Sequence, residues 1–156
     1  MDAVDKKIVT ILQREGRMTN VELAQRVGLT PAPTLARVHK LEELGYIQGY
    51  AAIVNREMIG LPVTAFVSVI LKEHGSEIAK RFIEMVAEFD QVLEVHHIAG
   101  EEDYLLKVVA SSPRDYELFV LNTLTALETV QRVKTTFVLS TPKSTTVVPI
   151  RHVEAE

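Results

Sequence analysis

Apolar side chains recur at helical spacing in three short stretches of the first sixty residues. The first predicted helix ends at Gly16, and the second runs from Thr19, which has capping-box spacing with Glu22, to Gly28. The third helix is predicted over Pro31–Leu44. The apolar faces comprise Val4, Ile8, Ile11 and Leu12 in the first helix, Val21, Leu23, Ala24 and Val27 in the second, and Leu35, Val38, Leu41 and Leu44 in the third.

The connection Gly28-Leu29-Thr30 is short enough to join the second and third helices as a helix-turn-helix. Thr30 suits an N-cap, and Pro31 suits the first helical position, where its missing N–H has no hydrogen bond to lose. Periodicity alone leaves two interpretations open: a DNA-binding helix-turn-helix, and a small three-helix bundle without a ligand.

The outward side of the third helix bears on this choice. Small side chains near its start would let the helix approach base edges, and the basic side chains would reach bases or phosphates. The residues expected on this side are Ala32, Thr34, Ala36, Arg37 and Lys40. The alternative is a solvated helix face that binds nothing.

Strand-like patterns dominate the rest of the chain. Residues 46–54 are expected to form a strand that leaves the first domain and pairs elsewhere, and residues 55–60 form a turn-rich hinge. Helices are predicted to begin at Ser76, after the turn His74-Gly75-Ser76, and at Ser112, which Pro113 follows. The remaining predicted strands are Val63–Lys72, Val92–Ile98, Tyr104–Ala110 and Thr129–Ser140, and a β-prone tail covers Thr145–Ile150.

The resulting order, β-α-β-β-α-β, is the ferredoxin-like arrangement, a four-stranded antiparallel sheet with both helices on one face. The predicted fold class is therefore α+β, with a helix-turn-helix domain over residues 1–48, a linker and hinge over 49–60, and a ferredoxin-like domain over 61–156. Phe66 and Ile70 lie on the second face of the first strand of this sheet, so both of its faces are expected to be partly buried. A partly apolar face without helices favours self-association through the sheet.

The net charge of the whole chain is less informative than the net charges of its two parts. The formal net charge is −4, but residues 1–60 hold 8 Lys and Arg against 7 Asp and Glu, a net of +1, which leaves −5 for the remainder. A small DNA-binding domain needs a local basic face rather than a basic total. The lack of cysteine, the acidic N-terminus and the absence of any apolar run near the roughly 20 residues of a membrane span favour a cytoplasmic setting.

Catalytic motifs are missing from the sequence. It contains no phosphate-binding glycine-rich loop, no HExxH and no nucleophile elbow. His96 and His97 are neighbours in a predicted strand and therefore point to opposite faces, which makes them a poor metal chelate. We expect no enzyme activity, no metal site and no cofactor, although ferredoxin-like folds do host enzymes.

Several short motifs, taken in order and spacing, resemble the Lrp/AsnC (leucine-responsive, or feast-famine) family of transcription regulators over nearly the whole chain. They are Asp5–Ile8 with Leu12, Gly16-Arg17, Glu22–Ala24, Val27–Pro33, Arg37-Val38, Leu41-Glu42, Ile47–Tyr50 and Gly100–Leu106. The resemblance implies a winged-type helix-turn-helix that binds double-stranded DNA, a β-strand linker and an effector-binding ferredoxin-like domain. It also implies homodimers, often assembled into octamers as tetramers of dimers, and small amino-acid effectors bound between dimers.

The resemblance also assigns site residues. The DNA-binding positions are Pro31, Ala32, Thr34, Leu35, Arg37 and Lys40, and the effector-binding positions are Gly100, Asp103, Tyr104, Thr135 and Thr136. Many relatives have basic residues where this chain has Ala36 and near His39, a departure that puts one phosphate contact and the operator sequence in doubt.

The chemistry of the assigned effector residues is compatible with an amino acid. Asp103 would pair with an α-ammonium group, while the hydroxyls of Thr135 and Thr136 would bind the α-carboxylate. Glu101 and Glu102 would favour a basic effector such as lysine or arginine, and a site that binds no effector is the alternative. The second interpretation of the whole chain is an amino-acid-binding or oligomerisation module with no direct role on DNA.

Overall fold

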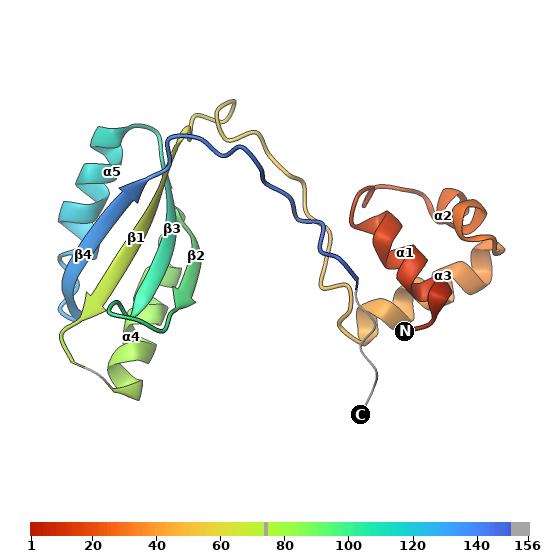
Figure 1. Cartoon of the computed structure of the whole chain (residues 1–156), viewed down its shortest axis with the longest axis horizontal. Helices are drawn as coiled ribbons and strands as arrows, with labels where there is room; N and C mark the ends of the chain where they lie inside the picture. The colour runs from red at the N-terminus through yellow and green to blue at the C-terminus, as the bar shows by residue number, and fades with distance from the viewer. Residues whose placement is uncertain (74, 151–156) are drawn as a thin grey trace. The chain divides into compact units, whose positions relative to one another are not determined.

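The computed structural model describes residues 1–73 and 75–150, which form two compact units (Figure 1). We call the first the head; it combines Met1–Ile53 with the chain from Pro142 onward. The second, the sheet unit, spans Val54–Thr141. The predicted domains assigned every residue after position 60 to the second domain, whereas the structure groups residues 142–150 with the head.

Three helices form the head: α1 (Ala3–Leu12), α2 (Asn20–Val27) and α3 (Pro31–Glu43). Thr19 caps α2 through a capping box with Glu22, as predicted, and Gly28 ends it at φ 79°, in the left-handed region that favours glycine. The three apolar faces meet in one small core made of Ile8, Leu23, Val27, Val38 and Leu41.

The buried side of α3 differs from the prediction. Thr34, Val38 and Leu41 face the core, whereas Leu35 and Leu44 remain 43% and 61% exposed. Val38 and Leu41 are buried as predicted, but the helical phase places Thr34 rather than Leu35 on their side. Thr34 can be buried because its hydroxyl donates a hydrogen bond to the carbonyl oxygen of Thr30, 2.9 Å away.

No strand forms in residues 46–54 of the described chain, so the strand predicted there is wrong, and the β-prone residues 145–150 form none either. Tyr50 is held instead by its phenol, which donates to the Glu42 carboxylate at 3.0 Å. The side chains of Ile53 and Val54 are 84% and 59% exposed. A β-strand exchanges backbone hydrogen bonds with a partner strand, and no such bonds join residues 46–54 to residues 145–150.

The sheet unit has the predicted order of elements. It comprises β1 (Val63–Leu71), α4 (Ser76–Ala87), β2 (Val92–His97), β3 (Tyr104–Ala110), α5 (Pro113–Phe119), a π-helical turn η1 (Val120–Leu124) and β4 (Val130–Phe137). The strands pair antiparallel in the order β2-β3-β1-β4, which confirms the ferredoxin-like fold. Ser112 caps α5 as predicted, but Gly75 rather than Ser76 occupies the N-cap of α4. His74, in the predicted turn, lies outside the described residues.

Both helices cover one face of the sheet (Figure 1). The core between the layers is built on alternate residues of β1, namely Ala65, Val67, Val69 and Leu71, which pack with Phe82 and other helix residues. The other side of β1 carries Phe66 and Ile70, both half-buried, which confirms that neither face is fully solvated. The part of the chain that the structure describes contains no helix long and apolar enough to cross a membrane.

Candidate DNA-binding helix and effector pocket

The exposed side of α3 is the first candidate site. Ala32, Leu35, Ala36 and Lys40 are exposed on it. Thr34 is not available there, because its side chain is fully buried in the head, so its predicted outward position is wrong. The surface that α3 offers is small and apolar at its start and carries one basic side chain further along, a composition that suits close approach to base edges.

Arg37 already has partners within the head. Its guanidinium forms ion pairs with Asp2, the N-cap of α1, at 2.5 Å and with Asp5, in the first turn of α1, at 2.7 Å. These carboxylates raise the pKa of Arg37, while the backbone N–H of Asp5 and then Arg37 lower the pKa of Asp2. Arg37 therefore connects α3 to α1. Asp2 and Asp5 have the spacing of one helical turn, but no local sequence pattern pairs them with Arg37, which lies 35 and 32 positions away.

A second contact fixes the start of α3. The Asn20 side chain, at the start of α2, donates to the carbonyl oxygen of Pro31 at 2.8 Å. The start of α2 and the start of α3 are thus held together by a hydrogen bond in addition to the turn that connects the two helices. Sequence reasoning missed this role because nothing in the periodicity distinguishes Asn20 from a solvated helix residue.

The second candidate site is a pocket of about 330 Å³ at one end of the sheet unit. Its walls are partly apolar, and it contains Asp103 and Tyr104, two of the predicted effector residues. The lining residues are Leu71, Gly75, Ser76, Ala79, His97, Asp103 and Tyr104. The pocket therefore offers apolar contact beside a carboxylate, which suits a small zwitterion with an apolar side chain.

Asp103 is held firmly at this pocket. One carboxylate oxygen accepts the Leu71 N–H at 2.8 Å, and the Asp103 N–H donates to the Val69 carbonyl oxygen at 2.9 Å. Tyr104, only 3% exposed, packs its ring against Phe82 and His97 with ring centroids 5.0 and 5.1 Å apart. Asp103 thus orders the end of β1 in addition to facing the pocket.

The structure does not bring all five predicted effector residues together within one chain. Gly100 lies in the β2–β3 turn, at φ 158°, next to the pocket residues in sequence. Thr135 lies on β4, two strands away from β3, a separation of about 10 Å across the sheet. Thr136 pairs with Phe66 and points to the opposite face from Thr135.

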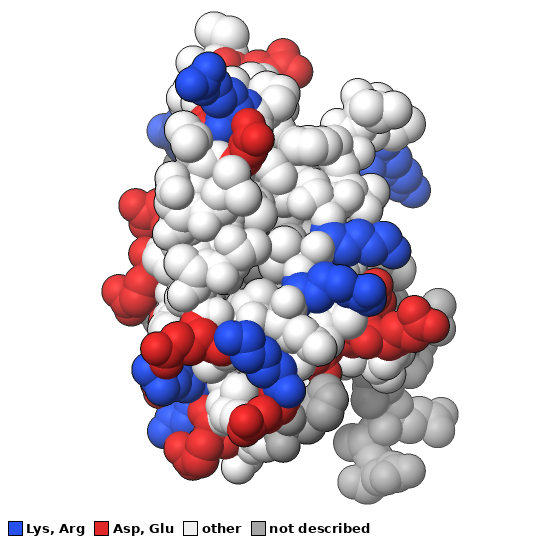
Figure 2. All heavy atoms as spheres, turned by 90° about the vertical axis from the view of Figure 1, so that its left-hand side faces the viewer, with Lys and Arg blue, Asp and Glu red and all other residues white. Residues whose placement is uncertain are grey.

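Thr135 belongs to a different hollow, a groove of about 690 Å³ along α5. Its hydroxyl is hydrogen-bonded to the Tyr116 hydroxyl at 2.5 Å, and the Tyr116 ring contacts Phe137 edge-on. Burial raises the pKa of Tyr116, while the hydrogen bond to Thr135 opposes that shift. Figure 2 shows a broad surface without charged side chains on this side of the sheet unit, with charged groups around its margins.

The acidic turn residues are only partly available for a basic ligand. Glu102 lies 3.7 Å from the Lys134 ammonium, so its charge is partly balanced. His96 contacts Glu94 on the open face, whereas His97 stacks on Tyr104, which confirms that the two histidines point to opposite faces. Among the described residues, no three His, Asp or Glu side chains gather in a way that could hold a metal ion.

Both parts of the chain match known protein families. A model of winged helix-turn-helix DNA-binding domains matches residues 1–48, and the model of the Lrp/AsnC ligand-binding domain matches residues 64–148. This chain belongs to the Lrp/AsnC family. It is therefore a DNA-binding transcriptional regulator with a ligand-binding domain, and not an enzyme.

Individual Lrp/AsnC relatives are similar over most of the chain. A leucine-responsive regulatory protein of Rhizobium meliloti is 44% identical over 135 residues, which cover 86% of each chain. The Bkd operon transcriptional regulator of Pseudomonas aeruginosa is 39% identical and covers 89% of this chain and 91% of its own. Among solved structures, a transcriptional regulator of Neisseria meningitidis in complex with L-Met is 37% identical, with a TM-score of 0.92 and 96% of each chain covered.

Proposed function

We propose that α3 enters the major groove of double-stranded DNA with the side that carries Pro31, Ala32, Leu35 and Lys40. The observation that carries this proposal is the exposure of Leu35 at 43% on a helix whose other side is anchored by buried Thr34, Val38 and Leu41. An exposed leucine in a groove-facing position suits a thymine methyl group, and Lys40 suits a phosphate or a base acceptor. Arg37 can reach DNA only by leaving or sharing Asp2 and Asp5.

The test begins with selection of bound sequences from a randomised duplex library. Affinity for the selected duplex is then measured by fluorescence anisotropy across a range of salt concentrations. Lys40→Ala should weaken binding and reduce the slope of log affinity against log salt by about 1, because one phosphate contact is lost. Lys80→Ala, on α4 of the sheet unit, is the matched control and should change neither quantity. An unchanged slope for Lys40→Ala would remove this residue from the interface.

We further propose that the pocket at Asp103 binds the α-ammonium group of a small amino acid with an apolar side chain. The apolar walls, Leu71 and Ala79, support leucine or methionine rather than lysine or arginine, as does the balanced charge of Glu102. The leucine-responsive relative and the L-Met complex of the Neisseria regulator agree with this class. Because Thr135 and Thr136 are distant within one chain, a carboxylate contact from them requires another copy.

Thermal shift against all twenty amino acids tests the effector proposal, since a ligand that binds the folded state raises its apparent stability. L-Leucine or L-methionine should raise the melting temperature, and Asp103→Asn should abolish the shift. Asp103→Asn retains an oxygen that accepts from Leu71, so it separates ligand binding from the structural role. A response to lysine or arginine alone, or to no amino acid, would contradict the proposed class.

We also propose a homodimer that assembles further, with tetramers of dimers as the largest form. The half-buried Phe66 and Ile70 on the helix-free face of the sheet support self-association there. Two heads related by a two-fold axis would bind a roughly palindromic operator with half-sites about one helical turn apart, or a multiple of that. Light-scattering mass with and without ligand, and the length of the DNase footprint, measure these states.

A further inference from the structure

The head contains a segment from the far end of the chain. Residues 142–150 belong to the same compact unit as α1, α2 and α3. Two crossings of the chain therefore join the head to the sheet unit, one at Ile53–Val54 and the other at Thr141–Pro142 (Figure 1). The function proposed above uses only the N-terminal part of the head and gives this C-terminal segment no role.

One side chain of α1's C-terminus binds the segment through its backbone. The Gln13 side-chain oxygen accepts the Val148 N–H at 2.7 Å, and the Gln13 side-chain nitrogen donates to the Val148 carbonyl oxygen at 3.3 Å. A single amide thus satisfies both backbone groups of one residue, as a neighbouring strand would. This contact recognises an extended backbone rather than a particular side chain.

The backbone of Val148 is bound beside a groove, while its side chain remains 65% exposed. Val148 lines a pocket of about 190 Å³ together with α1 residues Val9 and Leu12 and with residues 46–50. Thr146 lines the neighbouring pocket of about 680 Å³ with Arg14 and residues 49–53. Val147 and Ile150, on either side, are half-buried.

We infer that the head carries a docking groove for an extended segment, and that its occupant is the chain's own residues 145–150. We call this segment the strap. The groove is formed by the C-terminal end of α1 and residues 46–50. Gln13 binds the backbone of the occupant through hydrogen bonds. The strap follows β4, whose last ladder contact is the hydrogen bond from the Val138 N–H to the Thr64 carbonyl oxygen at 2.9 Å. Residues 138–144 connect the end of β4, the strand that carries Thr135, to the strap.

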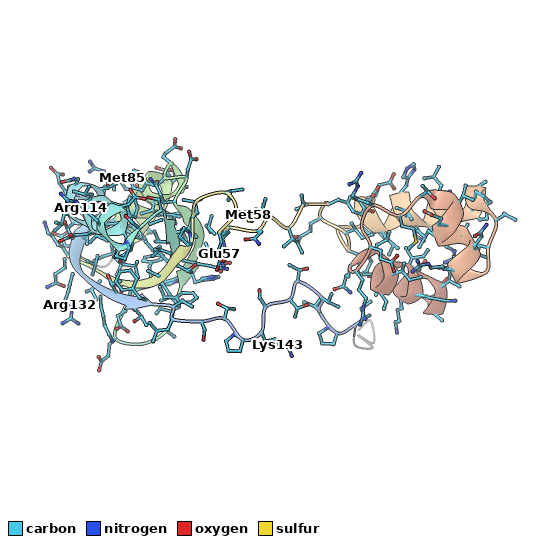
Figure 3. The ribbon with its side chains drawn as sticks, turned by 90° about the horizontal axis from the view of Figure 1, so that it is seen from above. Glu57, Met58, Met85, Arg114, Arg132 and Lys143 are labelled. Atoms are coloured by element: carbon cyan, nitrogen blue, oxygen red, sulfur yellow. The ribbon has the colours of Figure 1, made fainter. Side chains whose placement is uncertain are left out.

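Trypsin provides a direct test because Lys143 lies on the exposed stretch that leads to the strap (Figure 3). Gln13→Leu keeps the bulk of the side chain and removes the amide. Cleavage after Lys143 should be at least about tenfold faster in Gln13→Leu than in the native chain. A protease must draw several residues on each side of the cleaved bond into its active site, and docking of residues 145–150 restrains those that follow Lys143. Gln25→Leu, an exposed position on α2, is the control and should leave the rate unchanged.

Hydrogen exchange gives a second, independent readout. The Val148 amide should be protected in the native chain and in Gln25→Leu, and should lose its protection in Gln13→Leu. Val148→Pro removes the N–H donor from the opposite partner and should accelerate cleavage at Lys143 as Gln13→Leu does. Equal cleavage rates in all four proteins, together with equal exchange of the Val148 amide in the three proteins that retain it, would overturn the strap. Neither measurement uses DNA or an amino acid, so their failure is distinct from failure of the proposed function.

A mixing experiment decides whether the occupant comes from the same chain. Gln13→Leu chains have an intact strap and a defective groove, while Val148→Pro chains have the reverse. Docking within each chain leaves both variants fully sensitive to trypsin after they are mixed and refolded together. Partial protection in the mixed assembly would overturn the assignment to the same chain and would show that a second copy supplies the strap.

Discussion

At the scale of single residues, Arg37 shows that a basic side chain on α3 can form ion pairs within the head in the absence of DNA. Both Asp2 and Asp5 contact its guanidinium, and these carboxylates also form the capping box of α1. DNA phosphates would have to compete with two charges that are already in place. The free energy of such an exposed network is small and is screened by salt, so competition by a polyanion is physically reasonable.

A pair of substitutions separates the two roles of Arg37. Arg37→Ala should weaken binding to the selected duplex by about tenfold if the guanidinium contacts a base or a phosphate. Asp5→Asn, which can still accept the Asp2 N–H, should leave affinity equal or improve it, because one competing charge is removed. Fluorescence anisotropy measures both. Equal losses in the two variants would mean that Arg37 only positions α3 against α1.

Tyr50 provides a test by pH. Tyr50 is 52% exposed, and the partial desolvation of its phenol, with the hydrogen bond to Glu42 as a second cause, raises the pKa of Tyr50 from 10.0 to about 12. The protonated phenol is thus favoured in the folded head, so its contribution to stability is complete below pH 10 and is lost as the pH rises towards 12. The tyrosinate absorbance of the native chain minus that of Tyr50→Phe should therefore titrate near pH 12. A midpoint near 10 in the folded protein would show that the phenol is not held by Glu42.

At the scale of elements, the sheet unit could be predicted from sequence better than the head. Strict alternation in β1 fixes which residues face the core, because a strand has only two sides. A residue on a helix can face any direction around the axis, so spacing alone does not fix its orientation. In α3, Leu35 faces outward and Thr34 faces inward, where the Thr30 carbonyl oxygen accepts a hydrogen bond from the Thr34 hydroxyl. Two further contacts could not be predicted from a local pattern, because they join residues far apart in sequence. They are the ion pairs of Arg37 and the hydrogen bonds between Gln13 and Val148.

The orientation of α3 yields a matched pair of substitutions on one helix. Leu41→Ala removes a side chain that is 2% exposed and should cost about 2–5 kcal/mol of unfolding free energy. Leu35→Ala removes one that is 43% exposed and should change stability by no more than about 0.5 kcal/mol, while weakening binding to the selected duplex. Urea unfolding and anisotropy measure the two effects. A large stability loss for Leu35→Ala would return Leu35 to the core and remove it from the DNA-facing side.

At the scale of the whole molecule, neither proposed site is complete in one chain. The pocket at Asp103 has an ammonium partner but lacks the two threonines assigned to the carboxylate, and Thr136 lies on the helix-free face with Phe66. In the proposed dimer, one head would bind only half of a two-fold symmetric operator. Assembly would then link the two proposed activities, since an effector bound between copies would change how the heads are presented to DNA.

The helix-free face of the sheet gives the last prediction. Phe66 is half-buried in the single chain, and Ile70, four residues later in β1, lies on the same face. Placing a charge at this face would bury an unpaired ammonium in any dimer that forms through it, so Phe66→Lys should shift the light-scattering mass to that of the monomer. Ile83→Lys adds the same charge to an exposed apolar residue on α4, on the opposite layer, and should retain at least the dimer. Circular dichroism shows whether each variant is folded, and a folded Phe66→Lys protein with native mass would place the dimer contact on a different surface.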